Sequence, residues 1–373
     1  MSGGPHITPA RTESGTVASM NSVPFSRPAS PHHTERPPQI GLYGLGAMGW
    51  EVAINLAEHP YEHPAGSMPA PIVYNRTRAR CDKLAAQVGN DKIKIANDLE
   101  HLVLSCDIIL TSFASDAVVS ETYQKIHDIL KNSNVQLPRS KIFVETSTIY
   151  PTVAGEIDKL LSQLPHVFFL SCPVTGAPPA AKARQLIITM AGHYASKKEV
   201  AYLLVPSIAR KAYDLGGNVE KAATFKLLGN AFILGQLELI SESMTLAEKT
   251  GVGADYMMQY LKDVFPTPVI VNYASKLLND EFDGTKGFSI DGGIKDASHI
   301  RRLTNEANCP MPVVDIAHQH LLTARSIHQG KVTRNEPTFD VLDWSAIIAG
   351  TRAAAGLDPF DINKKSARVV KED

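Results

Sequence analysis

The length, composition and charge of the chain narrow the kinds of protein it can be. With 373 residues, 44% of them hydrophobic, the chain can form two packed domains and a tail. Lysine and arginine together number 37 against 38 acidic residues, so the charge does not favour nucleic acid or an anionic membrane surface as a partner. We therefore expect a small-molecule substrate as the partner, and neither nucleic acid nor a membrane.

The cysteines and the apolar segments bear on the compartment. The four cysteines lie far apart, form no CxxC pair and have no histidine beside them at metal-ligand spacing, which favours a reducing compartment and no metal site. No apolar stretch approaches the roughly 20 residues that span a bilayer, and the N-terminus lacks the apolar core of a signal peptide. We expect a cytoplasmic protein, with mitochondrial import as the alternative because Arg11, Arg27 and Arg36 stand among serines and threonines.

The first part of the chain is unlike the rest. Residues 1–38 are rich in Pro, Ser, Thr, Gly and His, with too few large apolar side chains to offset the entropy lost on ordering, so we expect a disordered tail. A short apolar run at residues 39–43 then leads into glycines and into a helical pattern that includes Trp50, Val52 and Leu56. This order predicts a strand, a turn and a helix.

A GxGxxG turn stands between that strand and that helix. Glycines permit the tight turn and let backbone N–H groups approach a pyrophosphate, while the N-terminus of the helix adds positive potential. The motif alone is a weak signal, but a strand before it and a helix after it are the context that it requires. The residues predicted to bind a dinucleotide here are Gly44, Leu45, Gly46, Ala47, Met48 and Gly49.

The end of the second predicted strand, residues 72–74, bears on the choice of nicotinamide cofactor. A carboxylate at this place normally accepts hydrogen bonds from the ribose 2′-hydroxyl of NAD. This chain has Asn75, Arg76 and Thr77 instead, and a guanidinium with a hydroxyl can hold a 2′-phosphate. We therefore predict NADP as the cofactor, with NADPH preferred over NADH. The Pro-rich stretch at residues 60–71 is expected to be an inserted surface loop.

Further short apolar runs predict a sheet. They alternate with helical patterns, which is typical of parallel strands joined by helical crossovers. The runs lie at residues 108–110, 142–144, 167–170 and 186–190. We predict an α/β fold in which residues 39–217 form a Rossmann-like, doubly wound NADP-binding domain.

Helical patterns dominate after residue 217. We expect residues 218–356 to form an all-α domain for substrate binding and dimerisation, followed by a flexible tail at residues 357–373. Its first helix is expected over residues 219–251, a length of about 45 Å, so it must lie against a second domain or a second subunit. The apolar residues of this helix include Phe225, Leu228, Phe232, Leu239 and Leu246.

Several spaced motifs occur in a fixed order along the chain. Residues 44–49 read GLGAMG, residues 171–177 read SCPVTGA, Lys226 and Asn230 stand at KxxxN spacing, and Lys295-Asp296 forms a KD pair. These motifs resemble GLGxMG, DAPVSGG, KxxxN and KD of the β-hydroxyacid dehydrogenase family, which includes 3-hydroxyisobutyrate dehydrogenase and is related to 6-phosphogluconate dehydrogenase.

Two further segments extend the resemblance, which covers about residues 39–350. Residues 145–149 (ETSTI) resemble the family's DSSTI segment, and residues 343–346 (DWSA) resemble its late DFSA segment. The resemblance implies a Rossmann-like N-domain and an all-helical C-domain built on the long helix. It also implies a homodimer or homotetramer in which the long helices pack across subunits.

The resemblance gives Lys226 and Asn230 catalytic roles. Lys226 would act as the acid or base for the substrate oxygen, and Asn230, one helical turn further on, would orient Lys226 or hold the substrate hydroxyl. A free lysine titrates near 10.4, so this role requires burial or neighbouring positive charge. Judged without the resemblance, such a pair on a helix would be a solvated pair.

The resemblance also implies the residues around substrate and cofactor. The substrate-binding residues would be Ser147, Thr175, Gly176 and Ala177. The further cofactor-binding residues would be Phe113, Ala114, Thr148, Phe288 and Lys295.

The expected function is that of an NADP-dependent oxidoreductase that interconverts a small β-hydroxyacid, or a related alcohol, and its semialdehyde or ketone. Two other hypotheses stay open: an imine reductase-like enzyme, a class that usually lacks the lysine, and a noncatalytic protein that binds NADPH or a partner. The chain departs from the family's glycines at Ala177, Pro179, Arg184 and Ala222, and has Ser171 where the loop motif opens with aspartate. Since loss of glycine restricts backbone approach, we expect a substrate pocket different from that of a 3-hydroxyisobutyrate enzyme.

Overall fold

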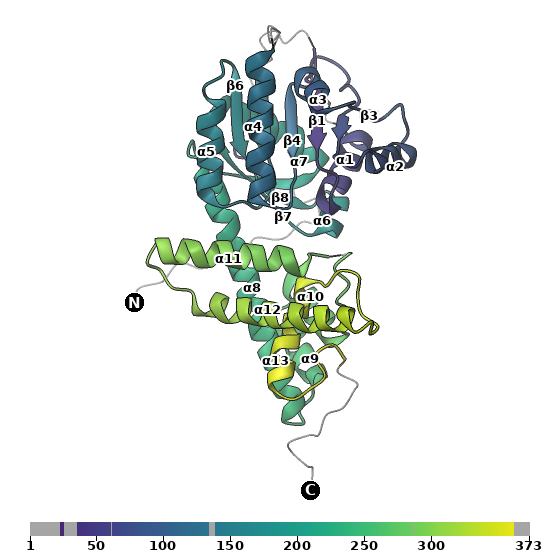
Figure 1. Ribbon diagram of the computed structural model, residues 1–373, viewed down its shortest axis with the longest axis vertical. Helices are drawn as coiled ribbons and strands as arrows, with labels where there is room; N and C mark the ends of the chain where they lie inside the picture. The colour runs from purple at the N-terminus through teal and green to yellow at the C-terminus, as the bar shows by residue number, and fades with distance from the viewer. Residues whose placement is uncertain (1–22, 26–35, 61, 134–138, 286, 362–373) are drawn as a thin grey trace, which may run out of the picture.

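The computed structural model describes residues 23–25, 36–60, 62–133, 139–285 and 287–361, and the rest of the expected tails lies outside this part of the chain. A sheet flanked by helices forms one part of the molecule and a group of helices forms the other, with α8 running between them (Figure 1). The predicted α/β fold, with a Rossmann-like domain followed by a helical one, is confirmed.

The strands and helices of the sheet part alternate along most of the chain. The strands are β1 (Ile40–Tyr43), β2 (Ile72–Tyr74), β3 (Lys94–Ile95), β4 (Ile108–Thr111), β5 (Lys141–Glu145), β6 (Val167–Ser171), β7 (Val174–Thr175), β8 (Leu186–Gly192) and β9 (Ala209–Asp214). The helices are α1 (Ala47–Glu58), α2 (Arg78–Val88), α3 (Leu99–Ser105), α4 (Asp116–Asn132), α5 (Pro151–Leu161), α6 (Pro178–Lys182) and α7 (Tyr194–Ser207).

The strands of the described residues form one sheet in the order β3-β2-β1-β4-β5-β6-β8-β7, with β9 paired to β8. The strands from β3 to β6 in this order are all parallel, whereas β8 runs antiparallel to β6 and β7 antiparallel to β8. The order reverses between β1 and β4, and in open α/β sheets such a switch point is where ligands bind.

The sequence predicted six of these strands and missed β3, β7 and β9. Two of the three are only two residues long, and β9 has the sequence ARKAYD, with charged residues at half of its positions. A short or half-exposed strand leaves little apolar periodicity to detect. Its partners in the sheet decide its conformation instead.

Two layers of side chains cover the faces of the sheet. One core contains Val52 of α1, Leu84 of α2 and Val200 of α7, and the other contains Leu102 of α3 and Tyr123 of α4. Both faces are therefore buried, as expected for parallel strands that consist almost wholly of apolar residues.

The helical part contains α8 (Glu220–Lys249), α9 (Ala254–Val264), α10 (Pro268–Leu278), α11 (Ile290–Glu306), α12 (Pro312–Thr333), the 3₁₀ helix η1 (Trp344–Ile347) and α13 (Ile348–Ala354). These elements share one apolar core, in which Leu227, Leu234 and Leu237 of α8 are buried. The long helix predicted over residues 219–251 is confirmed to within two residues at each end.

The apolar residues that the sequence singled out on α8 are largely exposed, although the ring of Phe225 lies 5.8 Å from that of Tyr213. Their exposed fractions are 41%, 50%, 68%, 56% and 63%, and they are Phe225, Leu228, Phe232, Leu239 and Leu246. The buried face of α8 is the opposite stripe, which packs against the other helices of its part. The helix was expected to lie against a second domain or a second subunit. Packing within this chain covers one face of it and leaves the other exposed.

A short piece of the expected tail contacts the sheet part. Phe25 is buried, its ring lies 5.7 Å from that of Tyr194, and its carbonyl oxygen accepts a hydrogen bond of 2.8 Å from the hydroxyl of Tyr202. At this position of the expected tail a single aromatic side chain thus packs against α7.

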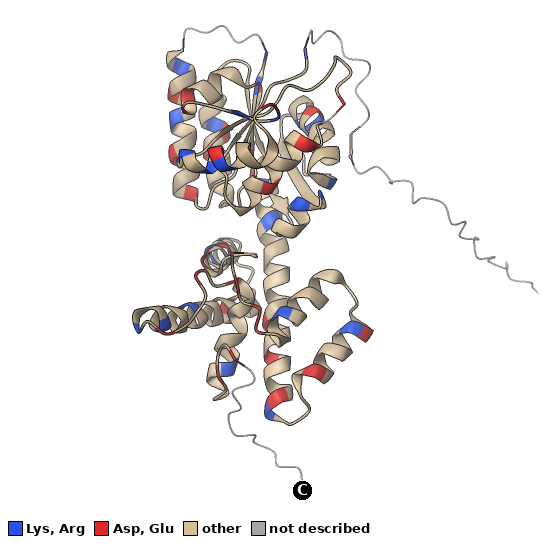
Figure 2. Cartoon of the chain, turned by 90° about the vertical axis from the view of Figure 1, so that its right-hand side faces the viewer, with Lys and Arg blue, Asp and Glu red and all other residues tan. Residues whose placement is uncertain are grey.

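Three further properties of the described residues bear on possible partners. Charged residues of both signs are interspersed over the sheet part and the helical part (Figure 2). None of the described helices combines the length and the apolar character needed to cross a membrane. In the same residues, no group of three His, Cys, Asp or Glu side chains is placed to hold a metal ion.

Candidate active site

The glycine turn between β1 and α1 has the close approaches that its sequence predicts. A Cβ at Gly44, where φ is +104°, would lie 2.1 Å from the carbonyl oxygen of Ser112, and a Cβ at Gly49 would lie 1.9 Å from that of Gly44. Gly46 has open space around it and, as the N-cap of α1, provides no side-chain cap. The first N–H groups of α1 are thus free to meet a pyrophosphate, so the turn fits a dinucleotide.

The end of β2 lies against this turn. The amide oxygen of Asn75 accepts a hydrogen bond of 3.0 Å from the backbone N–H of Leu45, and Arg80 donates one of 2.8 Å to the carbonyl oxygen of Leu45. Asn75 and Arg80 therefore hold the turn in place. Arg80 received no role from the sequence, because its contact bridges 35 residues.

Arg76 and Thr77 are placed differently. Both are exposed, Arg76 forms no hydrogen bond or ion pair within the described residues, and the Thr77 hydroxyl makes no capping bond to α2. By contrast, the guanidinium of Arg78 pairs with Asp82 at 3.1 Å and also reaches the carbonyl oxygen of Ala96. Arg76 is the arginine of this segment that is free to meet a ligand.

The loops that follow β4 and β5 are joined to each other. The backbone N–H of Phe113 donates a hydrogen bond of 2.7 Å to the hydroxyl of Ser147. The ring of Phe113 meets that of Tyr43 edge-on at 4.7 Å. Ala114 follows in the same loop, and Thr148 follows Ser147, so the fold brings these four predicted site residues together beside the glycine turn.

Helix α8 presents Lys226 and Asn230 on one face. The ammonium of Lys226 donates a hydrogen bond of 2.9 Å to Oδ1 of Asn230, whose Nδ2 donates one of 2.6 Å to Oδ2 of Asp296 on α11. Asp296 is buried, and Nζ of Lys295 lies 3.0 Å from its other carboxylate oxygen. The sequence noted Asp296 in the KD pair but gave it no role, since a contact across 66 residues is set by packing.

The surroundings of Lys226 change its pKa. Burial among protein atoms lowers the pKa of Lys226 from 10.5 to about 8, the nearby carboxylate of Asp296 acts to raise it, and the charge of Lys295 acts to lower it. The side chain still keeps a partly exposed surface. This is the perturbation that a lysine acid or base near neutral pH requires.

A contact between the two parts completes this cluster. Nζ of Lys295 donates a hydrogen bond to the carbonyl oxygen of Thr148. A continuous polar chain thus runs from Lys226 through Asn230, Asp296 and Lys295 to the loop after β5.

The predicted substrate loop lies at the edge of the sheet next to α8. Thr175 pairs with Ile187 across β7 and β8, and Gly176 has a φ of +136°. Ala177 then caps α6, where its carbonyl oxygen accepts from the N–H of Ala180. Thr175 makes no hydrogen bond to Lys226 or Asn230 in the described residues.

Phe288 lies in the helical part, just before α11. Its ring meets Trp344 edge-on at 4.9 Å, and its N–H donates a hydrogen bond of 2.9 Å to the buried carboxylate of Asp343. Asp343 also accepts from the N–H of Ser345. The structure thus places the predicted cofactor residue Phe288 just before α11, seven residues before Lys295.

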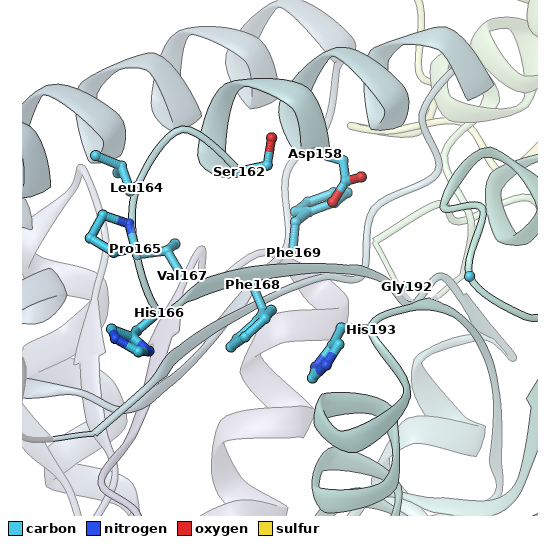
Figure 3. Close-up of a pocket in the computed structure, with 11 residues that line it drawn as sticks. Asp158, Ser162, Leu164, Pro165, His166, Val167, Phe168, Phe169, Gly192 and His193 are labelled. Carbon is cyan, nitrogen blue, oxygen red and sulfur yellow. The ribbon is translucent and has the colours of Figure 1, made fainter.

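One cavity of the described residues lies away from this site. It has a volume of about 420 Å³ and opens at the start of β6, where Phe168 and His193 stack at 4.3 Å (Figure 3). None of its lining residues is a predicted site residue. The polar cluster at Lys226, rather than this cavity, has the chemistry expected of an active site.

Comparison with known proteins agrees with this geometry. Residues 39–216 match the model of the NAD binding domain of 6-phosphogluconate dehydrogenase, and residues 221–335 match the model of the NAD-binding region of NADP-dependent 3-hydroxyisobutyrate dehydrogenase. The chain is 30% identical to an NADH-dependent oxidoreductase of Aspergillus ustus over 84% of this chain and 98% of the relative. The chain belongs to the β-hydroxyacid dehydrogenase family.

Two further relatives extend the comparison. An uncharacterised oxidoreductase of Bacillus subtilis is 28% identical over 83% of this chain and 98% of its own length. The crystal structure of 3-hydroxyisobutyrate dehydrogenase from Salmonella typhimurium has the same fold, with a TM-score of 0.67 at 17% identity over 84% of this chain and 99% of that one. This β-hydroxyacid dehydrogenase family member is therefore an oxidoreductase with a nicotinamide-binding domain, from a family of enzymes that act on CH–OH groups.

Proposed function

We propose that the protein is an NADP-dependent oxidoreductase that interconverts a small β-hydroxyacid, or a related alcohol, and its semialdehyde or ketone. The observation that carries this proposal is Lys226, whose pKa is lowered to about 8 and which is held by Asn230 beside the loop after β5. A lysine placed in this way can exchange one proton with a substrate oxygen near neutral pH.

In the proposed reaction Lys226 transfers the proton, and Asn230 and Asp296 orient Lys226. When bound, the nicotinamide supplies or accepts the hydride. In reduction the ammonium of Lys226 donates its proton to the substrate oxygen, and in oxidation the neutral amine takes the hydroxyl proton. Asp296 accepts from Nδ2 of Asn230, which leaves Oδ1 of Asn230 as the acceptor facing Lys226. Asp296 therefore orients the amide that orients the lysine.

The loop from Thr175 to Ala177 is the proposed place for the carboxylate of the substrate. Thr175 supplies a hydroxyl, and the backbone N–H groups at Gly176 and Ala177 follow it directly. This loop follows β7, which pairs with β8, and β8 contacts α8, the helix that carries Lys226.

The preference for NADP rests on Arg76 and Thr77. Both are exposed at the end of β2, and Arg76 is unpaired within the described residues. Its guanidinium is therefore available to bind the 2′-phosphate of the cofactor. The Aspergillus ustus relative is named NADH-dependent. The proposed preference for NADP thus rests on the residues at the end of β2 in this chain and not on the relative. Titration of the protein with NADPH and with NADH tests it directly.

We also propose a separate role for each of the two domains. Residues 39–217 would bind the cofactor, and residues 218–356 would complete the substrate site and mediate dimerisation. The exposed apolar stripe on α8 supports a homodimer or homotetramer. The free cysteines support a reducing compartment such as the cytoplasm.

The test is a panel of C3 to C6 semialdehydes, 2-keto esters and cyclic imines, followed by the absorbance of NADPH. We expect turnover of a semialdehyde or keto compound. The variant Lys226→Ala should lower kcat at least about a hundredfold, as expected when a positioned acid or base is lost. Lys221→Ala, which changes an exposed lysine near the start of the same helix, is the control and should keep its rate.

Each other result has a meaning. Turnover of imines alone would favour an imine reductase-like enzyme, and cofactor binding without any turnover would favour a noncatalytic protein. A near-normal rate in Lys226→Ala would remove this lysine from the mechanism.

A further inference from the structure

The carboxyl group of Glu145 lies beneath the loops after β4 and β5, which carry the predicted cofactor-binding residues Phe113, Ala114 and Thr148. Glu145 is the last residue of β5 and is 1% exposed. Its Oε1 accepts a hydrogen bond of 2.7 Å from the N–H of Ser147, and its Oε2 accepts one of 2.8 Å from the hydroxyl of Thr111. One carboxyl group thus joins the ends of β4 and β5.

The loop after β4 is attached to the loop after β5 at two further points. Ser147 uses its hydroxyl to accept from the N–H of Phe113 at 2.7 Å, and the hydroxyl of Thr146 donates to the carbonyl oxygen of Thr111 at 2.7 Å. Since Glu145 fixes the backbone of Ser147, it also fixes where Phe113 can lie. No other carboxylate of the described residues hydrogen-bonds to Ser147 or Thr111.

We propose that Glu145 is a positioning residue for the nicotinamide end of the cofactor, acting through Ser147 and Phe113 and not on the adenine end. The proposal rests on the proposed function in one respect, namely that these loops meet a nicotinamide. The glycine turn and the end of β2, which would hold the pyrophosphate and the 2′-phosphate, make no hydrogen bond to Glu145.

The chemistry of the network explains why a hydrogen-bonding group is needed at this position. Burial raises the pKa of Glu145 to about 7, so charge itself is costly here, while the bonds from Ser147 and Thr111 act to lower the pKa. The hydroxyl of Tyr123 lies 2.8 Å from that of Thr111, and either oxygen can be the donor. The network can therefore be satisfied with Glu145 ionised or neutral.

Because a neutral group can also satisfy this network, Glu145→Gln is a conservative variant. The amide oxygen can accept from Ser147, and the amide nitrogen can donate to Thr111, whose own hydrogen then turns toward Tyr123. Glu145→Ala removes both partners and leaves the N–H of Ser147 unpaired in a buried place, which is costly.

The experiment compares two ligands by isothermal titration calorimetry. One is the whole cofactor, NADPH or NADH, whichever the wild type binds more tightly. The other is its fragment without nicotinamide, 2′-phospho-ADP-ribose or ADP-ribose. Glu145→Ala should weaken the whole cofactor about fivefold or more and leave the fragment within about twofold. Glu145→Gln should bind both ligands like the wild type.

A second variant keeps the test decisive if Glu145→Ala does not fold. Thr111→Val removes the hydroxyl that donates to Glu145 while keeping the shape of the side chain. It should also weaken the whole cofactor alone. An equal loss for both ligands, or no loss for either, would overturn the positioning role while leaving the proposed function intact. Failure of the wild type to bind either nicotinamide cofactor would overturn both proposals.

Discussion

At the scale of single residues, the proposed catalytic role of Lys226 depends on the groups that surround it. Its hydrogen-bond partner Asn230 is one turn along the same helix, and the spacing of the two is visible in the sequence. The groups that change its pKa, Asp296 and Lys295, come from α11 about 70 residues later. The helical spacing supplies the pair, whereas burial, the largest cause, lowers the pKa of Lys226.

The pH dependence of the reaction should follow the protonation of Lys226. Reduction needs the ammonium form, so kcat/KM for reduction should fall as the pH rises through about 8, whereas kcat/KM for oxidation should rise over the same range. Because the charge of Asp296 raises the pKa of Lys226, the variant Asp296→Asn should move the fall in the reduction profile to lower pH. Two parallel profiles that both fall with pH would contradict this assignment.

Cofactor preference should depend on Arg76. Loss of a charge-assisted contact to the 2′-phosphate in Arg76→Ala should weaken NADPH binding about tenfold and leave NADH binding unchanged. Arg78→Ala is the matched control, because Arg78 is already held by Asp82. Titration by the quenching of protein fluorescence measures both. Tighter binding of NADH than of NADPH by the wild type would show that Arg76 does not select the cofactor.

At the scale of elements, α8 carries two stripes with different roles. Leu227, Leu234 and Leu237 are buried among the helices of the second part. The exposed stripe contains four apolar residues at successive seven-residue intervals, a spacing that keeps them on one face of a helix. They are Phe225, Phe232, Leu239 and Leu246. A face of this kind is typical of helices that pack against a second copy.

We expect this exposed stripe to be the dimer contact. The wild type should be a dimer or tetramer by sedimentation, and Leu239→Glu should shift it to monomers because it places a charge in an apolar interface. Val332→Glu on α12, which likewise changes a half-exposed apolar residue to a charged one, is the control and should keep the wild-type mass. A monomeric wild type would rule out the contact.

At the scale of the whole molecule, one face of α11 connects the helical part to the sheet part. Besides Lys295, which reaches the carbonyl oxygen of Thr148, Nε2 of His299 lies 3.2 Å from the carboxylate of Asp116, and Glu306 accepts from the hydroxyl of Tyr150. These contacts fall on the loop after β5 and on the first residue of α4. The helix that carries Asp296 therefore also contacts the segments that follow β4 and β5.

Loss of one of these contacts should lower the stability of the whole chain slightly. Removing the partly buried pair of His299 and Asp116 in His299→Ala should reduce the thermal midpoint by about 2 °C, as expected for one hydrogen bond in a chain of this size. His59→Ala, at an exposed position after α1, is the control. Differential scanning calorimetry measures both, and equal midpoints would show that the contact contributes nothing.

The sequence by itself determined the features that depend on neighbours along the chain. Local geometry, which depends on the order of residues along the chain, determines four features. They are the glycine turn at residues 44–49, the alternation of strands and helices, the long helix from Glu220, and the spacing of Lys226 and Asn230. For the same reason Arg76 and Thr77 could be placed at a strand end in advance.

Only the tertiary structure decided which distant residues meet. Four features depend on contacts between residues far apart in the sequence. They are the antiparallel pairing of β8 with β6, the exposed apolar stripe on α8, the hydrogen bond of Asn230 to Asp296, and the burial of Glu145 beneath two loops. Such contacts form because whole faces pack to bury apolar surface, and no single spacing along the chain records which faces will meet.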